Sequence, residues 1–415
     1  VVGLGYVGLP LSLAMTDAGY DVIGVDIDEE RVTSLRAGSS YVNDVSDAAV
    51  SRGISAGFDP TTEYDALADV QAVSICVPTP MRKSGTPNLS YVASAVEELA
   101  SVIPTGCTVL LESTVYPGAT EEFVAETLSD TGRTLGEDIF VAFSPERIDP
   151  GNEEYGPTDI PKVLGGVTAA CGDRAEALYE PVFDTVVRVD SATEAELVKL
   201  LENTFRAVNI GLINELARIA HRLDVDIWSA IEAAATKPFG YMPFYPGPGL
   251  GGHCIPVDPM FLSWQAKQQG VQTRFIDLAD QVNREMPDHV VHRLVRLLND
   301  RGIALSNAEI LVLGVSYKPD VSDTRESPAI DIIDRLSEWG ASVRYHDPYV
   351  PELQLPETMH ESADLTTDQL ESADCTVIVT DHTKFDLDQI VSHSSLVFDT
   401  RNATTGVESE HIVRL

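Results

Sequence analysis

Short apolar runs alternate with segments of helical periodicity over the first 190 residues. The apolar runs predict strands at residues 1–2, 21–26, 72–77, 108–112 and 139–143, and the periodic segments predict helices at residues 10–18, 29–37, 90–102 and 119–128. Strands that alternate with helices are typical of a parallel sheet covered by crossover helices. We therefore expect a doubly wound α/β domain over residues 1–190.

The periodicity changes after residue 190. Thr193 and Glu196 form a capping-box pattern at the start of a long apolar repeat, and the first Gly or Pro after them is Gly211. This predicts one helix to about Leu223, roughly 45 Å long at 1.5 Å per residue. Because a helix of that length commonly bridges domains or packs against a partner chain, we expect a central helical domain over residues 191–300.

A second alternating pattern begins near residue 306. It predicts strands at residues 310–315, 343–346, 376–380 and 396–399 and a helix at residues 327–339. The expected fold class is therefore α/β, with two Rossmann-like doubly wound domains joined by a helical central domain that contains the long helix. The third domain is expected over residues 301–415.

The first residues contain a glycine motif between a strand and a helix. Gly3 permits a tight turn, Gly5 lets the backbone approach a pyrophosphate, and Gly8 lets the helix pack closely on the strand. Asp26 ends the second strand, where a carboxylate can accept a hydrogen bond from a ribose 2′-hydroxyl and repels a 2′-phosphate. The pattern predicts NAD rather than NADP, and the alternative is a glycine turn that binds no nucleotide.

Cys254 lies in a glycine-rich stretch, residues 245–259, whose glycines leave room for backbone to wrap a ligand such as a diphosphate. Asp258 and Pro259 resemble an N-cap followed by Pro at the first helical position. A thiol just before a helix has its thiolate stabilised by the dipole and the free amides, so Cys254 is a candidate nucleophile. We expect Cys76, Cys107 and Cys375, at or beside apolar strands, to be buried and inert.

Two further patterns carry candidate chemistry. Lys199, Asn203 and Arg206 share one face of the long helix, where they either meet an anion or form a solvated polar stripe. The segment at residues 112–118 follows a strand, so its hydroxyls either hold a ligand or cap the next helix.

The five cysteines lack a Cys-x-x-Cys pair, so the sequence predicts neither a disulfide framework nor a metal site.

The charge balance narrows the function classes. There are 28 Lys and Arg residues against 65 Asp and Glu, a net charge of −37, which argues against a general nucleic-acid or anionic-membrane binder. The longest apolar runs fall short of the 18 residues that a membrane span needs. Such acidity favours a high-salt cytoplasm, and the alternative is an ordinary acidic protein. The odd number and wide spacing of the cysteines favour reduced thiols in a cytoplasm. Because Val1 almost directly precedes the glycine motif, we expect a few upstream residues to be missing.

Eight segments in order resemble the UDP-glucose/GDP-mannose dehydrogenase family. They are VVGLGYVGLP, CVPTP, ESTVYPG, FSPERIDPGN, ELVKLLENTFRAVN, YPGPGLGGHCIPVDP, GVSYKPDVSDTRESPA and VFDTRN. The resemblance implies a cytoplasmic enzyme of polysaccharide biosynthesis that uses NAD to oxidise C6 of a nucleotide sugar to the uronic acid. It also implies a homodimer or higher homo-oligomer.

The resemblance implies a role for each matching residue. Cys254 forms a thiohemiacetal and then a thioester with the sugar. Lys199 serves as acid/base or oxyanion stabiliser, and Asn203 is an amide donor to the oxyanion. Thr114, Glu146 and Asp258 position and activate waters, although Asp258 is alternatively only a cap and a partner for Lys199. The cofactor-binding residues implied are Gly3, Gly5, Tyr6, Val7, Gly8, Asp26, Arg31, Thr79, Thr114 and Arg325. The substrate-binding residues implied are Glu146, Arg147, Ile148, Lys199, Asn203, Arg206, Tyr245, Gly249, Gly251, Lys318 and Arg401.

Departures from the family pattern bear on the sugar. UDP-glucose members usually carry a glutamate at the position of Pro150 and a serine at that of His253. We therefore expect a UDP-N-acetylhexosamine, either UDP-N-acetylmannosamine or UDP-N-acetylglucosamine, with UDP-glucose oxidation to UDP-glucuronate as the alternative. Lys237 stands near the position of a family arginine that reaches the partner subunit's substrate, which puts that contact in doubt.

Two other functions compete with this interpretation. A single-step hydroxyacid dehydrogenase of the 6-phosphogluconate type shares the dinucleotide domain and a helix-borne lysine, but it has no use for Cys254. A nucleotide-sugar-binding regulator without activity predicts damaged catalytic positions, whereas all six are present. A count of NADH formed per substrate separates the enzymes.

Overall fold

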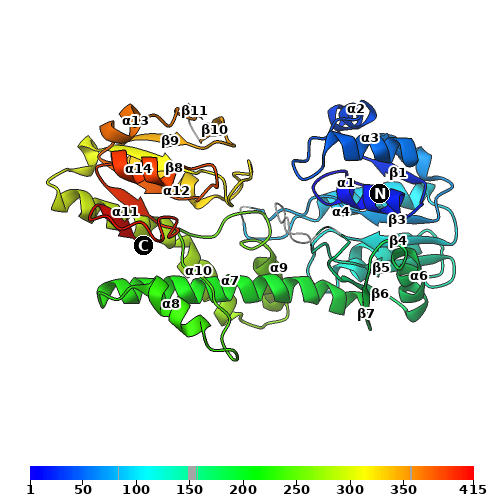
Figure 1. Ribbon diagram of the computed structural model, residues 1–415. Coiled ribbons are helices and arrows are strands. Elements are labelled where there is room, and N and C mark those ends of the chain that lie inside the picture. Colours follow the sequence, from blue (N-terminus) through cyan, green and yellow to red (C-terminus); the bar gives the residue numbers. More distant parts are fainter. Residues whose placement is uncertain (83, 148–155, 157, 356–357) are drawn as a thin grey trace. The chain divides into compact units, whose positions relative to one another are not determined.

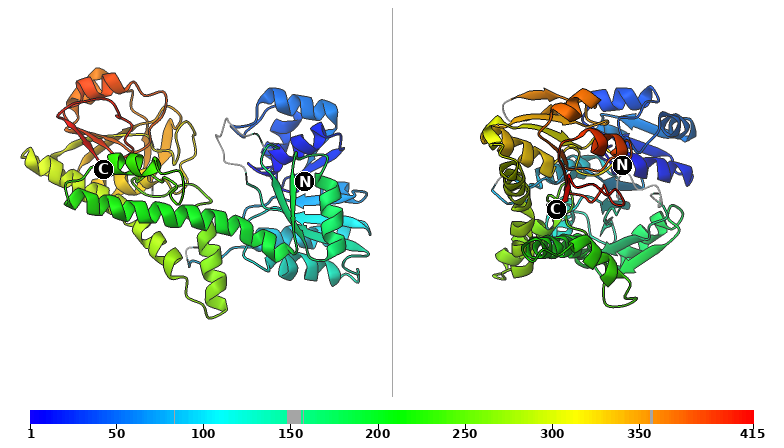
Figure 2. Two further views of the ribbon diagram at one scale, coloured as in Figure 1. Left: turned by 60° about the horizontal axis from the view of Figure 1, so that its bottom comes forward. Right: turned by 60° about the vertical axis from the view of Figure 1, so that its left-hand side comes forward.

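The computed structural model describes residues 1–82, 84–147, 156, 158–355 and 358–415. The chain divides into two compact units, each described by itself. The first contains Val1–Glu202 and Met260–Gln272, and the second contains Asn203–Pro259 and Thr273–Leu415. Helix α7 (Ala192–Arg222) contributes residues to both units and is continuous in every view (Figures 1 and 2), so the single long helix predicted from the periodicity is confirmed.

The first unit is built on a mostly parallel sheet. Its strands are β1 (Val22–Val25), β2 (Phe58–Thr61), β3 (Ala72–Ile75), β4 (Cys107–Leu111), β5 (Ile139–Phe143), β6 (Lys162–Gly166) and β7 (Val186–Val189). Strands β3 to β7 lie in sequence order, and Val2 bridges β1 to β3. Strand β6 runs antiparallel to β5, while the other paired strands of this unit run parallel. The glycine motif follows Val2, where the strand order reverses.

The helices of this unit pack apolar faces against the sheet. They are α1 (Gly8–Asp17), α2 (Glu29–Arg36), α3 (Asp47–Ala56), α4 (Ser90–Val102), α5 (Glu126–Ser129) and α6 (Ala169–Tyr179), with a 3₁₀ turn η1 (Tyr64–Leu67). The segment predicted as a helix at residues 119–128 is helical throughout, as a π-helix, η2 (Thr120–Ala125), that continues into α5. The core buries Leu4, Leu9, Phe58, Leu110 and Tyr179.

The second unit contains a fully parallel sheet. Its strands, in spatial order, are β14 (Ile412–Arg414), β13 (Val397–Asp399), β12 (Cys375–Ile378), β8 (Glu309–Leu313) and β9 (Ser342–His346). The order reverses between β8 and β12, which is the switch point where doubly wound sheets bind ligands at the carboxyl ends of the strands. A small antiparallel pair, β10 (Glu352–Gln354) and β11 (Met359–Glu361), flanks the sheet.

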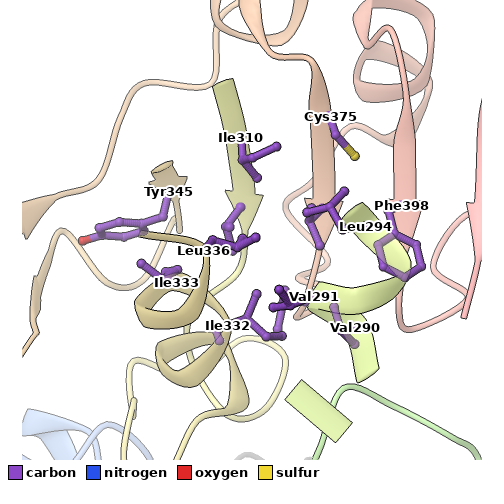
Figure 3. Close-up of a cluster of buried hydrophobic side chains, with 14 of the residues drawn as sticks. Val290, Val291, Leu294, Ile310, Ile332, Ile333, Leu336, Tyr345, Cys375 and Phe398 are labelled. Carbon is purple, nitrogen blue, oxygen red and sulfur yellow. The ribbon is translucent and has the colours of Figure 1, made fainter. Parts of the chain in front are cut away.

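Helices cover both faces of this second sheet. They are α11 (Met286–Asp300), α12 (Pro328–Glu338), α13 (Thr367–Ser372) and α14 (Leu387–His393), while α8 (Ile227–Ala235), α10 (Arg274–Arg284) and the 3₁₀ turn η3 (Leu305–Asn307) complete the unit. Figure 3 shows the main core, where Val291 and Leu294 of α11 and Ile332 of α12 lie in one buried cluster with Ile310 of β8 and Phe398 of β13. Each Å² of apolar surface removed from water stabilises the folded state by about 25 cal/mol, so such a cluster is the main source of the unit's stability.

The predicted fold class is confirmed: two doubly wound α/β domains are joined by helices that include α7. The three domain boundaries remain predictions. Helix α9 (Asp258–Gln268) begins at Asp258 itself, so the prediction that this residue precedes the helix was one position off. Among the helices described, none combines the length and apolar character that crossing a bilayer requires.

Candidate active site

The glycine motif forms a tight turn beside a pocket. Gly3 has φ +88°, and a Cβ on it would lie 2.7 Å from the Cys76 carbonyl oxygen. A Cβ on Gly8 would lie 1.8 Å from the Gly3 carbonyl oxygen, so α1 approaches the turn too closely for a side chain. A Cβ on Gly5, in contrast, would meet none of the described atoms within 4 Å. Gly5 therefore exposes its backbone to the pocket, as the approach of a pyrophosphate requires.

The pocket beside Gly5 has a volume of about 340 Å³ and is lined by Gly5, Tyr6, Asp28, Glu30, Arg31, Ser34, Tyr41 and Val42. Asp26, at the end of β1, is buried and accepts hydrogen bonds from the backbone N–H groups of Leu4 (2.8 Å) and Asp28 (3.0 Å). Arg31 pairs with Asp26 at 3.5 Å and lies over the ring of Tyr41. The carboxylate is thus held rigidly beside a space lined by exposed backbone, and these residues fit the adenosine half of a dinucleotide.

Three other residues predicted to bind the cofactor lie apart from this pocket's lining. Thr79 is buried shortly after β3, and Thr114 is half-buried in the segment that follows β4. Arg325 belongs to the second unit, where its guanidinium donates three hydrogen bonds to the Asp323 carboxylate, at 2.9, 3.0 and 2.6 Å. Thr79 and Thr114 follow neighbouring strands of the first sheet, at the edge where ligands bind in such sheets.

A buried glutamate fixes the segment that carries Thr114. Glu196 of α7 accepts hydrogen bonds from the N–H groups of Gly118 (2.5 Å) and Thr120 (2.8 Å), at the start of η2. Burial raises the pKa of Glu196 to about 7, although its amide donors oppose the shift. Because Lys199 lies one turn further along α7, this clamp ties the Thr114 segment to the helix that carries the predicted acid/base lysine.

The structure brings Lys199 and Glu146 together. The Lys199 ammonium donates to the Glu146 main-chain carbonyl at 2.5 Å. The Glu146 carboxylate is buried and accepts from the N–H of Arg147 at 2.7 Å. The Arg147 guanidinium in turn pairs with Glu202 of α7 at 2.5 Å. The lysine thus bonds to the backbone of the segment whose carboxylate is predicted to activate water.

A third group at this position was missed by the sequence reasoning. Lys162, the first residue of β6, is buried and lies 3.3 Å from the Glu146 carboxylate and 2.6 Å from that of Glu112. The reversed strand explains the placement. Phe143 pairs with Gly165, and the same antiparallel register carried three residues further sets Glu146 opposite Lys162. The sequence does contain a sign of this pairing, because Lys162 directly precedes the apolar run at residues 163–167. A lysine in a buried strand is tolerated only with an acidic partner.

A second cluster, in the other unit, contains Cys254, Asp258 and Asn203. The Cys254 carbonyl accepts from the N–H groups of Val257 (3.1 Å) and Asp258 (2.8 Å), so helical bonding begins at the cysteine. The Asn203 amide donates to the buried Asp258 carboxylate at 2.5 Å. Cys254 is exposed, whereas the other four cysteines are buried, as predicted for Cys76, Cys107 and Cys375. Its position one turn before α9 is the setting that stabilises a thiolate.

The glycine-rich segment before Cys254 packs tightly against its own unit. A Cβ on Gly251 would lie 2.7 Å from the Tyr317 side chain, and one on Gly249 would lie 3.1 Å from Pro328. A Cβ on Gly247 would lie 2.7 Å from the Arg401 guanidinium. These positions therefore require glycine for close packing within the unit, in addition to any requirement of ligand binding. Sequence reasoning also missed the buried Asn214, whose side chain accepts from the N–H of Gly247 at 2.9 Å and fixes this segment.

The remaining predicted substrate residues are spread over the second unit. Lys318 follows β8 and Arg401 follows β13, both at the carboxyl edge of the sheet, and Arg401 donates to the Val379 carbonyl at 2.8 Å. Arg206 is exposed on α7, one turn from Asn203. Tyr245 stacks on Trp228 and donates to Glu232 of α8, which assigns it a packing contact within the unit. Ile148 and Pro150 lie outside the described residues.

The structure thus places some of the predicted residues in a dinucleotide pocket, a Glu146–Lys199 cluster and a Cys254–Asp258–Asn203 cluster, while the others lie outside these three groups. Lys237 lies over the ring of Phe239. In the part of the chain that the structure describes, a group of three or more residues able to hold a metal ion is not found.

Comparisons with known proteins match the whole chain. The models of the UDP-glucose/GDP-mannose dehydrogenase family match in order: the NAD binding domain over residues 1–183, the central domain over 193–285 and the UDP binding domain over 311–406.

Two curated relatives and one solved structure illustrate the similarity. A UDP-N-acetyl-D-mannosamine dehydrogenase of Methanococcus aeolicus is 36% identical over 390 residues, covering 93% of this chain and 84% of the relative. A UDP-N-acetyl-D-glucosamine 6-dehydrogenase of Pseudomonas aeruginosa is 36% identical over 87% of this chain and 84% of the relative. The structure of a UDP-D-ManNAc dehydrogenase from Pyrococcus horikoshii superposes with a TM-score of 0.92 and 33% identity, covering 100% of this chain and 98% of that one.

Proposed function

Because the chain belongs to the UDP-glucose/GDP-mannose dehydrogenase family, and is therefore an NAD-dependent nucleotide-sugar dehydrogenase, we propose that it oxidises C6 of a UDP-N-acetylhexosamine to the carboxylate. UDP-N-acetylmannosamine and UDP-N-acetylglucosamine are the two candidate substrates, since a relative named for each is 36% identical to this chain over the matched residues. UDP-glucose is the alternative. The observation that carries the proposal is the exposed Cys254 one turn before helix α9, whose first residue Asp258 pairs with Asn203.

NAD, when bound in the pocket beside Gly5 and Asp26, supplies the hydride acceptor for both oxidations. In the first, Lys199 receives the proton of the C6 hydroxyl or stabilises the oxyanion as the aldehyde forms. The Cys254 thiolate then adds to the aldehyde carbon and gives a thiohemiacetal. After the second loss of a hydride the sugar is held as a thioester, whose oxyanion the Asn203 amide stabilises. Water then attacks this thioester and releases the carboxylate and the thiolate.

Thr114, Glu146 and Asp258 are proposed to position and activate the waters that take part. Glu146 is suited to this role because its carboxylate is held in place by an N–H donor and by Lys162. Asp258 is held by Asn203, so its second role as the cap and anchor of α9 remains compatible with water activation. The phosphates of the substrate require cations, and Lys318 and Arg401 lie at the carboxyl edge of the second sheet.

We expect two NADH per sugar. The test incubates the protein with NAD in 2 M KCl and with a panel of UDP-N-acetylmannosamine, UDP-N-acetylglucosamine and UDP-glucose. The proposal predicts that an N-acetylhexosamine is oxidised with two NADH and one carboxylate formed per molecule. One NADH per molecule with an aldehyde or ketone product would instead identify a single-step dehydrogenase, and preference for UDP-glucose would identify the alternative substrate.

We also propose that two copies of the chain associate through α7. Large apolar side chains form an exposed stripe at helical spacing in the second unit: Leu212, Leu216, Ile219 and Leu223 are 53%, 40%, 47% and 67% exposed. A second copy would remove this stripe from water. The double variant Leu212→Glu/Leu216→Glu is expected to elute at the mass of one chain and the parent at twice that or more. Equal masses for the two would argue against this surface.

Cytoplasmic location and a saline environment complete the proposal. All five cysteines, each within the described residues, are free of disulfides, which suits a reducing compartment. Cell fractionation tests the location, and salt-dependent stability tests the environment.

A further inference from the structure

A chain of buried polar groups extends from Lys162 away from Glu146, and the reaction described above assigns no role to the groups beyond Lys162. The Ser74 hydroxyl lies 3.0 Å from the Tyr179 hydroxyl, which donates to one oxygen of Glu112. The Lys162 ammonium donates to the other oxygen of Glu112 at 2.6 Å and to the Glu146 carboxylate at 3.3 Å. All these residues belong to the first unit.

In this chain of groups one buried ammonium faces two buried carboxylates. The side chains of Lys162, Glu112 and Glu146 are 4%, 0% and 10% exposed, so each charge alone would be costly. Burial by itself lowers the pKa of Lys162, but the two carboxylates outweigh burial and raise the pKa above its usual range. The ammonium also lies over the rings of Tyr179 and Phe183, at 5.6 and 5.2 Å, which favours the cation. One ammonium therefore serves two buried carboxylates.

Three further ionisable groups lie near Glu146, namely Cys76, Lys199 and Arg147. The Cys76 thiol is buried, and its pKa is raised well above the usual value, so it is neutral. The Lys199 ammonium bonds to the main-chain carbonyl of Glu146, and the Arg147 guanidinium pairs with Glu202. Lys162 donates to the carboxylate itself.

We propose that Lys162, held by Glu112 and Tyr179, is a positioning residue that fixes the Glu146 carboxylate and keeps it ionised for thioester hydrolysis. This rests on the proposed function, in which Glu146 activates the attacking water. Water adds to the thioester carbon while one of its protons passes to Glu146. The C–S bond then breaks, Cys254 leaves as the thiolate, and the carboxylic acid formed releases its own proton to solvent.

Lys162 and Glu112 have opposite effects on the Glu146 carboxylate: the ammonium favours its ionised form and the second carboxylate opposes it. In Lys162→Met the favourable positive charge is lost, so the acid limb of the hydrolysis rate is expected to move up by roughly one to three pH units, with hydrolysis near neutral pH slowed about 10-fold or more. In Glu112→Gln the competing negative charge is lost, so Lys162 acts on Glu146 alone and the acid limb is expected to move down. A purely structural role predicts no such opposed pair of shifts.

The experiment follows single turnovers of the full-length enzyme with NAD and the UDP-sugar that the panel identifies as the substrate. Rapid acid quench and intact mass spectrometry give the rate at which the sugar leaves Cys254, measured across pH 5 to 9 for each variant. Tyr20→Phe is the matched control, because the Tyr20 hydroxyl donates to the carbonyl of Leu178, next to Tyr179, outside the chain of groups. The acid limb of the hydrolysis rate in Tyr20→Phe is expected to coincide with that of the parent enzyme.

The outcomes separate the inference from the proposed function. Opposed shifts in Lys162→Met and Glu112→Gln support the inference. A covalent sugar that forms and hydrolyses normally, with the acid limb unmoved in both variants, overturns the inference and leaves the function intact. A parent enzyme that never carries sugar on Cys254 overturns the function itself. If Lys162→Met does not fold, the downward shift in Glu112→Gln decides alone, because this isosteric change keeps the lysine buried beside Glu146.

Discussion

The Cys254→Ser variant is expected to lose steady turnover by roughly three orders of magnitude or more, while binding the nucleotide sugar and NAD as the parent does. A serine hydroxyl one turn before α9 forms no anion comparable to a thiolate, because its pKa is too high for the helix dipole and the free amides to ionise it. The sugar would then lack the covalent attachment that precedes the second oxidation. NADH formation in steady state and binding by calorimetry measure the two properties separately.

Cys171→Ala provides the matched control for this result. Cys171 is another cysteine of the chain, buried on α6 and 3.1 Å from the Thr168 hydroxyl, outside the predicted clusters. We expect this variant to lose some stability and to keep its turnover. Undiminished turnover in Cys254→Ser, or equal losses in both variants, would contradict the covalent mechanism.

Removal of salt is expected to unfold the protein. The chain carries a net charge of −37, and the self-repulsion of that charge destabilises the compact state. The Debye length is about 3 Å in 1 M salt and about 10 Å in 0.1 M salt, so dilution restores repulsion between carboxylates several residues apart on the surface. We expect the melting temperature to rise steeply with KCl and the native circular dichroism signal to be lost below about 0.1 M.

Sucrose separates screening from general stabilisation of compact states. It is excluded from protein surfaces and strengthens burial without screening charge. At equal osmolality, KCl is expected to restore the folded state more fully than sucrose. A melting temperature that is indifferent to KCl would show that the acidity is an ordinary surface property and would remove the case for a high-salt cytoplasm.

Local pattern was sufficient for much of the fold. Strand β5 and helix α4 occupy the residues that apolar runs and helical spacing predict, because their apolar positions are fixed by local periodicity. Strands β2 and β6 were missed. The first contains Asp59 and Pro60, and the second begins with a lysine and ends in two glycines, so each owes its strand conformation to its neighbours in the sheet.

For the candidate site, too, local sequence motifs predicted some residues and missed others. Motifs identified the residues expected to touch the cofactor or sugar, such as Asp26 and Cys254, since these need particular side chains at particular spacings. The groups that hold them, such as Lys162 and Glu196, come from segments far apart in the sequence. Their pairing depends on strand direction and on contacts across the sheet, which periodicity does not report.

The reversed direction of β6 has a consequence for how relatives can diverge. Because hydrogen bonds to β5 and β7 set where Lys162 stands, its meeting with Glu146 does not depend on how many residues connect them. Insertions and deletions between positions 147 and 161 can therefore accumulate, and with them new preferences for the ligand, while the ion pair is inherited unchanged. A shift of one position within either strand would instead send the lysine to the opposite face and leave a carboxylate without its cation.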